Sequence, residues 1–355
     1  MAIMRRLRHS PAFVALCLLA VLPPGNFAFA ADLVRVGEAP FLGGGPFYIA
    51  REKGYFKKLD LEVETRRFDS GASVARAIAA GELDLALVPP DAILFNSVAK
   101  GASLAVVLDG GRNRRGFGST VISVAQALHE DGITSVLHFE RIKGKKFGVP
   151  ALGSVNQYNA SFSLTMAKLD PAKDVEWVAG VPQTELMHML ARQEVAAADL
   201  AYQLGLLAQN NKWGAIVIND DVIVPDAQVS VFAAHRAFLA KNRDAAIRFA
   251  MAYLRAIGDF NTTAIDPWAH SDVVDILAQS IPLGTPELIR ASAPNWLYIA
   301  DDGVPLVKSI LDIQDVLSTK HFGPIEKKAS RQQLFDFNIT KDAKARLAKY
   351  KPFGN

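Results

Sequence analysis

The stretch PFLGGGPFYIAREKGYFKK, residues 40–58, places three consecutive glycines directly after the strand-like segment LVRVGEA. Gly43, Gly44 and Gly45 carry no Cβ, so the backbone there can approach another group closely. The glycines do not have the G-x-G-x-x-G or GxxxxGK[ST] spacing of nucleotide-binding loops, which excludes a phosphate cradle of known type. Two interpretations stay open: the mouth of a site for another small molecule, which backbone N–H groups would face, or an ordinary surface loop.

Around this stretch, strand-like and helix-like segments alternate in short units. LEVETRRF at 61–68 alternates apolar and polar residues, SVARAIAAG is helical up to its glycine, and DLALVP is a buried strand. The same order recurs after KKFGVP at 145–150, and the segments at 78–92 and 190–204 align without a gap. This alternation predicts an α/β fold with two parallel-rich sheets built from one kind of unit. From about residue 231 onward the sequence is mostly helical.

The first thirty residues have the features of a secretory signal peptide. Arg5, Arg6 and Arg8 precede an apolar stretch at 11–22, and the small-residue sequence AFA ends the segment at residue 30. The apolar stretch is shorter than the roughly 20 residues that cross a bilayer. We therefore expect export and cleavage, with a retained N-terminal anchor as the alternative.

Composition limits the partners of the mature chain. The only cysteine, Cys17, lies inside the predicted signal, so thiolate chemistry and cysteine-bound zinc are not expected. The whole chain has 39 Lys and Arg against 36 Asp and Glu, and loss of three arginines leaves 36 against 36. A chain of zero net charge has no polyanion footprint, so we expect no nucleic acid partner. Its length favours two domains, and we expect a monomer.

Catalytic and metal-binding motifs are not found in the mature sequence. Its six histidines show no HxH, HxxxH or HExxH spacing, and there is no G-x-S-x-G motif. We interpret the acidic pairs Asp220–Asp221 and Asp301–Asp302 as solvated turns. The sequence therefore predicts a protein that is not an enzyme and that has no metal site and no cofactor.

Four loops between predicted strands and helices are candidates for ligand contact: FLGGGPF, DSGAS, PPDA and ALGSVNQY. In parallel sheets, ligands collect at the carboxyl ends of the strands, where helix N-termini present free N–H groups. Ser70, Ser73 and Ser154 can cap helices there and also donate hydrogen bonds to a ligand. A simple helix cap is an equally good interpretation of each residue alone.

Two stretches carry a resemblance to a known family. PFYIAREKGYFKKLDLEVE at 46–64 and GASVARAIAAGELDLALVPPDAIL at 71–94 resemble the opening of substrate-binding proteins of ABC importers. The branch is the one that serves nitrate, alkanesulfonates, taurine and the pyrimidine precursor of thiamine. RIKGKKFGVPALGS is similar to the entry strand of the second domain in this family. The resemblance implies a two-lobed type II periplasmic binding fold, with helix-flanked sheets and two crossing segments around a cleft.

The resemblance also implies how the chain is divided. Residues 31–120 and 226–355 would form the first lobe, with the C-terminal helices, and residues 121–225 the second lobe. The crossings would lie near 118–124 and 222–231.

The positions that match cleft residues of the family fall on the four loops and on one later strand end. These positions are Phe41, Gly44, Gly45, Ser70, Ser73, Pro90, Asp91, Ser154, Asn156, Tyr202 and Gln203. Phe41, Phe47 and Tyr202 would form aromatic walls suited to a flat or partly apolar ligand.

The cleft departs from the family in its charge. Anion-binding members commonly supply a basic residue, and the matching loops supply none. Arg112, Arg114 and Arg115 are the nearest candidates, although a solvated basic loop is the favoured interpretation. Asp91 would disfavour a simple dianion.

The function implied by the resemblance is that of a periplasmic solute-binding protein. It would capture a small polar or aromatic-polar molecule, close by hinge bending and deliver the molecule to an ABC permease in the inner membrane. One alternative is an enzyme similar to pyrimidine-precursor synthases, which the cysteine-free mature chain disfavours. Another is a binding protein that serves a sensor.

Overall fold

The computed structural model describes residues 31–319, 325–349 and 353. Asp32–Asn355 forms one compact unit. The predicted signal peptide, with Cys17, lies outside the described residues.

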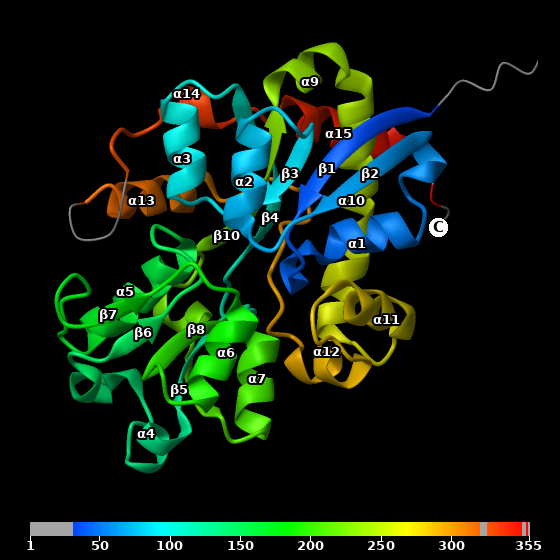
Figure 1. The fold of residues 1–355 in the computed structure, drawn as a ribbon. Coiled ribbons are helices and arrows are strands. Elements are labelled where there is room, and N and C mark those ends of the chain that lie inside the picture. The colour runs from blue at the N-terminus through cyan, green and yellow to red at the C-terminus, as the bar shows by residue number, and fades with distance from the viewer. Residues whose placement is uncertain (1–30, 320–324, 350–352, 354–355) are drawn as a thin grey trace, which may run out of the picture. The chain divides into compact units, whose positions relative to one another are not determined.

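Two five-stranded sheets organise this unit (Figure 1). The first sheet has the order β2-β1-β3-β10-β4, with bounds Leu61–Arg67, Asp32–Glu38, Leu85–Val88, Gln228–His235 and Leu104–Arg112. The second has the order β7-β6-β8-β5-β9, with bounds Glu176–Val178, Lys146–Gly148, Ala197–Ala201, Thr120–Ala125 and Gly214–Asn219.

Both sheets have the same mixed topology. In the first, β1 pairs in parallel with β2 and β3, and β10 pairs antiparallel with β3 and β4. In the second, β6 pairs in parallel with β7 and β8, and β5 pairs antiparallel with β8 and β9. The antiparallel strand beside β3 or β8 comes in each case from a segment that has crossed from the other sheet. The predicted α/β class with a repeated unit is therefore confirmed.

Fifteen α-helices connect or cover the strands in the described part of the chain. Their bounds are α1 Gly45–Glu52, α2 Gly71–Ala79, α3 Ala92–Ala99, α4 Gln126–Glu130, α5 Val155–Met166, α6 Gln183–Ala191, α7 Tyr202–Asn210, α8 Asp220–Ile223, α9 Arg236–Lys241, α10 Arg243–Ile265, α11 Ser271–Ser280, α12 Pro286–Ser292, α13 Val307–Leu317, α14 Arg331–Leu334 and α15 Asn338–Lys349. Three short 3-10 helices complete the set: Leu42–Gly44, Lys57–Leu59 and Val136–Ile142.

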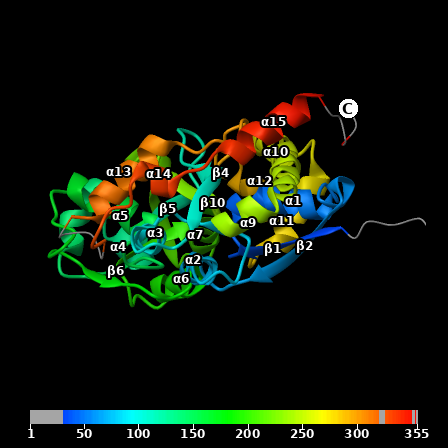
Figure 2. The same ribbon diagram turned by 90° about the horizontal axis from the view of Figure 1, so that it is seen from above.

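The first sheet is apolar on both faces, as expected for a sheet covered by helices. Leu85 and Leu87 of β3 join a cluster with residues of α1, α10 and α11, whereas Ala86 and Val88 join residues of α2, α3 and α13. The strand therefore divides its alternate side chains between two cores. Helix α15 packs along α10 beyond the first core, as Figures 1 and 2 show from two directions.

The second sheet also has a core on each face. Ile122 and Phe147 pack with Ala160 and Leu164 of α5, and Leu200 packs with residues of α6 and α7 on the other face. Helix α5 thus covers the second sheet as α1 covers the first.

The chain passes from the first sheet to the second between Arg112 and Thr120 and returns between Asn219 and Gln228. Buried Asp109 holds the end of β4 in place, because its carboxylate accepts from Gly111 N at 2.8 Å and from Gln228 Nε2 at 2.6 Å. The predicted lobe boundaries, 31–120 with 226–355 and 121–225, remain a prediction.

Candidate functional site

The triple glycine is explained by packing within the first core. A Cβ on Gly43 would lie within 3.0 Å of Leu297 and Phe41, one on Gly44 would meet the Tyr48 hydroxyl, and one on Gly45 would meet Phe260. The N–H groups of Gly44 and Gly45 are already bonded within the turn, to Phe41 O and Leu42 O. The prediction that these two glycines present N–H groups to a ligand is therefore wrong. These positions are glycine because side chains packed against the start of α1 leave no room for a Cβ.

Phe47 is a core residue. Its side chain is fully buried, and its ring lies 5.8 Å from that of Phe56, 6.1 Å from Phe232 and 6.3 Å from Phe249 between centroids. The prediction of Phe47 as an aromatic wall is wrong, because the ring points into the first core. Phe41 stays half-buried at the loop.

Three of the other predicted residues cap the helices that follow their loops. The Ser70 hydroxyl accepts from Ser73 N at 3.3 Å, Asp91 Oδ1 from Ile93 N and Leu94 N at 3.0 Å each, and Ser154 Oγ from Gln157 N at 3.1 Å. The helix-cap interpretation is therefore confirmed at these positions. A capping oxygen keeps a further lone pair, so this role is compatible with ligand contact.

The loops from the two sheets meet directly. Ala92 N, next to Asp91, donates to Gly153 O at 3.0 Å, so the loop after β3 is bonded to the loop after β6. A Cβ on Gly71 would lie 2.8 Å from Cδ of Pro89. The start of α2 is therefore in contact with the loop that follows β3. The structure thus brings Ser70, Pro90, Asp91 and Ser154 to one junction between the sheets.

Asp91 is buried at this junction, with 2 % of its surface exposed. Burial raises its pKa to about 6, although the bonds from Leu94 N and Ile93 N act in the opposite direction. A carboxyl group in this environment disfavours an anion next to it.

Helix α5 carries the predicted Asn156 into a set of buried polar groups. Asn156 Nδ2 donates to Asp199 Oδ1 at 2.8 Å, Asn159 Nδ2 donates to Asp220 Oδ2 at 2.5 Å, and the Thr120 hydroxyl donates to the same Asp220 oxygen. We call Thr120, Asn156, Asn159, Asp199 and Asp220 the polar seam. It joins α5 to the start of β5, to the middle of β8 and to Asp220, which follows β9.

The two acids of the polar seam are fully buried. Burial raises the pKa of Asp199 well above its ordinary value, and the charge of Asp220 adds to this effect. Burial also raises the pKa of Asp220 to about 6, against the hydrogen bonds from Thr120 and Asn159. The interpretation of Asp220–Asp221 as a solvated turn is therefore wrong. Asp220 has no exposed surface and Asp221 has 4 %, because α5 and the crossing segment cover them.

Four members of the polar seam were not found by the sequence reasoning: Thr120, Asn159, Asp199 and Asp220. One signal was available for Asp199, which is the single charged residue in the apolar run VAAADLA at 195–201. A lone acid in a buried strand is unusual enough to be singled out.

Tyr202 and Gln203 begin α7, a few positions after Asp199 of the polar seam. Tyr202 follows β8, is partly exposed, and its N–H donates to Ser119 O at 2.8 Å. Gln203 is 4 % exposed.

The three arginines of the crossing segment do not belong to the seam. The guanidinium groups of Arg112 and Arg114 lie 5.1 and 4.4 Å from the centre of the Tyr298 ring, and Arg115 is exposed. Arg112 Nε is also 3.7 Å from Asp226.

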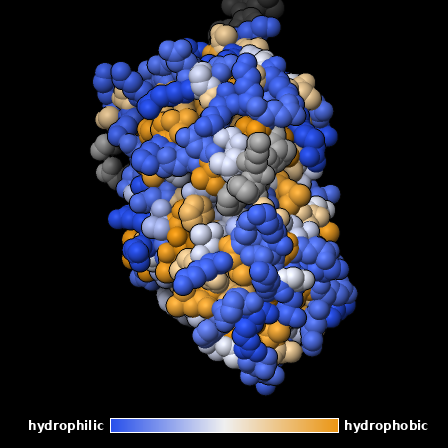
Figure 3. Space-filling model, turned by 90° about the vertical axis from the view of Figure 1, so that its left-hand side faces the viewer, coloured by the Kyte–Doolittle hydropathy of each residue, from blue (hydrophilic) through white to orange (hydrophobic). Residues whose placement is uncertain are grey.

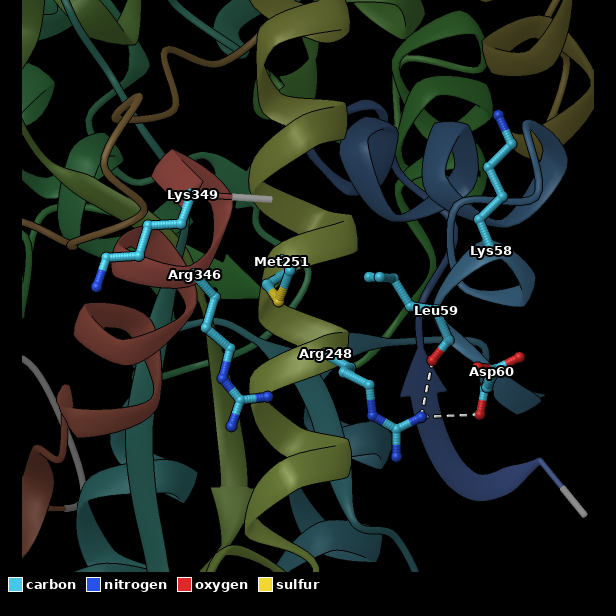
Figure 4. Close-up of a pocket in the computed structure, with 7 residues that line it drawn as sticks. All are labelled: Lys58, Leu59, Asp60, Arg248, Met251, Arg346 and Lys349. Atoms are coloured by element: carbon cyan, nitrogen blue, oxygen red, sulfur yellow. Dashed lines mark hydrogen bonds between the residues drawn. The ribbon is translucent and has the colours of Figure 1, made fainter. Parts of the chain in front are cut away.

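A hollow of about 360 Å³ lies elsewhere, between the Lys57–Leu59 turn, α10 and α15 (Figure 4). Two of its four basic residues, Arg248 and Arg346, already have partners. Arg248 donates to Leu59 O at 2.7 Å and Asp60 O at 2.9 Å, and both Arg248 and Arg346 bind Asp244. None of the predicted site residues lines it, so we do not favour it as the ligand site.

The described residues lack two further kinds of feature. They contain no helix with the length and apolar character needed to span a bilayer, and no group of three or more His, Cys, Asp or Glu side chains placed for a metal ion. On the face drawn in Figure 3, polar and apolar side chains are interspersed.

Comparison with known proteins gives a consistent result. A model of the NMT1-like family matches residues 31–278. A Brucella abortus protein, BAB2_1146, whose name describes it as a binding protein, is 29 % identical over 256 residues, or 70 % of this chain and 73 % of the relative.

Two solved structures share the fold. The ligand-binding component of an ABC-type import system from Staphylococcus aureus, solved with zinc bound, has a TM-score of 0.72 and 16 % identity over 88 % of this chain and 99 % of its own. The periplasmic aliphatic sulphonate binding protein of Escherichia coli has a TM-score of 0.66 and 17 % identity over 86 % of this chain and 92 % of its own. The predicted periplasmic binding fold is therefore confirmed.

Proposed function

Because this chain belongs to the NMT1-like family and has a periplasmic binding fold, we propose that it is the ligand-binding component of an ABC-type import system. One observation carries the proposal: Ala92 N bonds to Gly153 O at the junction of the two sheets. Loops that follow parallel strands of both sheets meet there. Their helix N-termini and the polar seam offer the polar groups that fix a small ligand.

The mechanism follows from the two crossings of the chain. Ligand would bind first to the loops of one sheet, and bending of the segments 112–120 and 219–228 would bring the other loops onto it. Only a ligand that contacts both sets of loops can favour the closed form, because the shift depends on its differential affinity for the two forms. The Ala92–Gly153 bond is then part of the closed arrangement.

The ligand is a small polar or aromatic-polar molecule held by Ser70, Ser73, Asp91, Ser154 and Asn156. Phe41, Pro90, Tyr202 and Gln203 complete the contact surface. The mature protein would act in the periplasm as a monomer and deliver its ligand to a permease of the inner membrane. The relatives described as binding proteins support this function over that of an enzyme.

A thermal-shift screen of residues 31–355 tests the proposal, with sulfonates, nitrate, aromatic acids, pyrimidines and amines as probes. A specific ligand should raise the melting temperature by mass action on the folded state. Tyr202→Ala should abolish the response, because it removes a wall next to the polar seam. Asn210→Ala, at the exposed other end of α7, is the matched control and should keep the response. Turnover of a probe by the purified protein would contradict the proposal.

A further inference from the structure

The polar seam contains two carboxylate oxygens without a partner. Asp199 accepts through Oδ1 and Asp220 through Oδ2, whereas Asp199 Oδ2 and Asp220 Oδ1 have no hydrogen bond although both side chains are fully buried. The two carboxyl groups accept from Asn156 and Asn159, which lie one turn apart on α5, and the charge of Asp220 raises the pKa of Asp199. One proton between the two free oxygens would satisfy both, and two bare carboxylates in this place would be strongly unfavourable.

The surroundings decide which carboxyl group carries that proton. Asp220 accepts from both Thr120 and Asn159, and these bonds favour its charged form. Asp199 accepts only from Asn156, so its charged form is less well supported. Asp199 would therefore be the neutral acid, and its Oδ2–H would donate to Asp220 Oδ1.

This arrangement fixes the orientation of Asn156. Since the Asp199 proton points to Asp220, the Asp199 oxygen that faces Asn156 can only accept. The Asn156 amide must turn its Nδ2 inward and its carbonyl oxygen outward. The side chain is partly exposed, so this oxygen is the atom left for a ligand.

We propose that Asn156, oriented by the Asp199–Asp220 pair, selects a ligand with an N–H donor, such as an amine or an amino-substituted heteroaromatic ring, over an oxyanion. This inference rests on the proposed function. Asn159 supports it, because its Nδ2 is also used inside the seam and its fully buried Oδ1 has no partner. Asp91 at the sheet junction adds a further acceptor of the same kind.

The charges around the pair agree with this class of ligand. The groups with the largest effect on the two acids are Asp221 on α8, Thr120 on β5, and Asn156 and Asn159 on α5, which are acidic or neutral. Asp221 itself accepts from Gly116 N at 2.8 Å. An oxyanion would need donors, and the polar seam offers oxygens.

The first experiment tests the shared proton without any ligand. Infrared difference spectra of the wild type and Asp199→Asn, at pH 7, should show the C=O band of one protonated carboxyl group in the wild type alone. Asparagine at 199 can still accept from Asn156 and donate to Asp220, so this variant should fold with nearly unchanged stability. A spectrum without the protonated band would overturn the inference, whatever the protein binds.

The second experiment tests the ligand class by calorimetry with matched probes: 4-aminopyrimidine and 4-methoxypyrimidine, ethylamine, ethanesulfonate and nitrate. We expect binding of an amino probe and loss of about 10-fold in affinity on Asn156→Ala, which corresponds to one hydrogen bond. Asn210→Ala is again the control.

The outcomes separate this inference from the proposed function. Binding of ethanesulfonate or nitrate that survives Asn156→Ala would overturn the donor class and leave a binding protein in place. Equal affinity for the amino and methoxy probes would overturn it as well. No binding by any probe, together with turnover of one of them, would contradict both proposals.

Discussion

Strands β3 and β8 occupy the same place in their two sheets but carry different chemistry at one position. Leu85 and Ala197, the first residues of these strands, stand 112 positions apart (197 − 85), and the same offset relates Leu87 to Asp199. Leu87 packs in the first core and pairs with Phe232, whereas Asp199 is buried opposite Ile122. Because leucine occupies the equivalent position of the first sheet, the fold does not require an acid at position 199.

The helices that cover these strands differ in the same way. Helix α1 places Phe47 and Tyr48 in an apolar core, and α5 places Asn156 and Asn159 against buried acids. Helix α1 thus contacts its sheet through aromatic packing, whereas α5 contacts its sheet through apolar packing and also through hydrogen bonds. This excess polarity in one of two equivalent places is what the second sheet would contribute to the proposed ligand site.

Leu87→Asp should have the largest effect, because it puts an acid in β3 without the partners that β8 provides. Burying an unpaired carboxyl group in an apolar core should cost about 4 kcal/mol or more, enough to prevent folding. Denaturant unfolding and the yield of folded protein measure this. Leu87→Met, which conserves volume, is the control and should cost less than about 1.5 kcal/mol. A stable Asp variant would show that the two positions are interchangeable.

Asp199→Leu is the reciprocal exchange and should cost about 3 kcal/mol. It removes the acceptor of Asn156 Nδ2 and leaves Asp220 buried without its neighbour's proton, and breaking one side of a buried pair is strongly destabilising. Urea unfolding at pH 7 compares it with Asp199→Asn, which should be nearly neutral. If leucine were as stable as asparagine, the hydrogen bonds of the polar seam would contribute nothing to the fold.

The glycines provide the next smaller effect. Gly45→Ala places a methyl group against Phe260 and Leu277, and overpacking of this kind costs about 1 to 3 kcal/mol. Gly258→Ala is the matched control: its Cβ would meet only Arg255 at 3.8 Å, on the exposed side of α10, so it should stabilise by about 0.5 to 1 kcal/mol. Both values come from thermal or urea unfolding. A neutral Gly45→Ala would restore a role for this loop other than packing.

The sequence predicted the repeated unit well, because local periodicity determines it. The gapless match of 78–92 with 190–204 corresponds in the structure to α2 with α6 and β3 with β8. The family resemblance and the capping serines could also be found from short segments. A helix cap, for example, depends on residues only three or four positions apart.

The errors concern contacts between segments far apart in sequence. The space beside Gly45 is filled by Phe260, more than 200 residues later, and no local pattern distinguishes that from space for a ligand. The burial of Asp220 depends likewise on α5, some 60 residues earlier. Sequence spacing shows which polar residues lie in a turn. Only the packing of other helices and strands shows which of these residues are buried.

Asp91→Asn should change the pH dependence of the free energy of unfolding more than the size of that free energy. The folded pKa of Asp91, about 6, lies above the ordinary value of 3.8, so the folded protein holds an extra proton between these values. Its contribution to stability is present at low pH and is lost as the pH rises from about 4 to about 6. Asparagine still caps α3 and does not titrate, so the difference between wild type and variant should vary across this window. Urea unfolding from pH 4 to pH 8 measures the slope, and parallel curves would show that Asp91 is not protonated in the folded protein.

The smallest effect is expected from the caps of α2 and α6, which stand at equivalent positions. Ser70 caps α2 with its hydroxyl group, whereas Pro182, 112 positions later (182 − 70), leaves α6 without a side-chain cap. Ser70→Ala should cost about 1 kcal/mol by loss of the cap. Pro182→Ser should gain less, because a new cap of about 0.5 to 1 kcal/mol is offset by the greater freedom of the unfolded chain without proline. The backbone at 182, with φ −59° and ψ 149°, permits serine, so the two variants can be compared by urea unfolding at one pH. If Ser70→Ala lowered ligand affinity and left stability unchanged, the serine would act on the ligand and not as a cap.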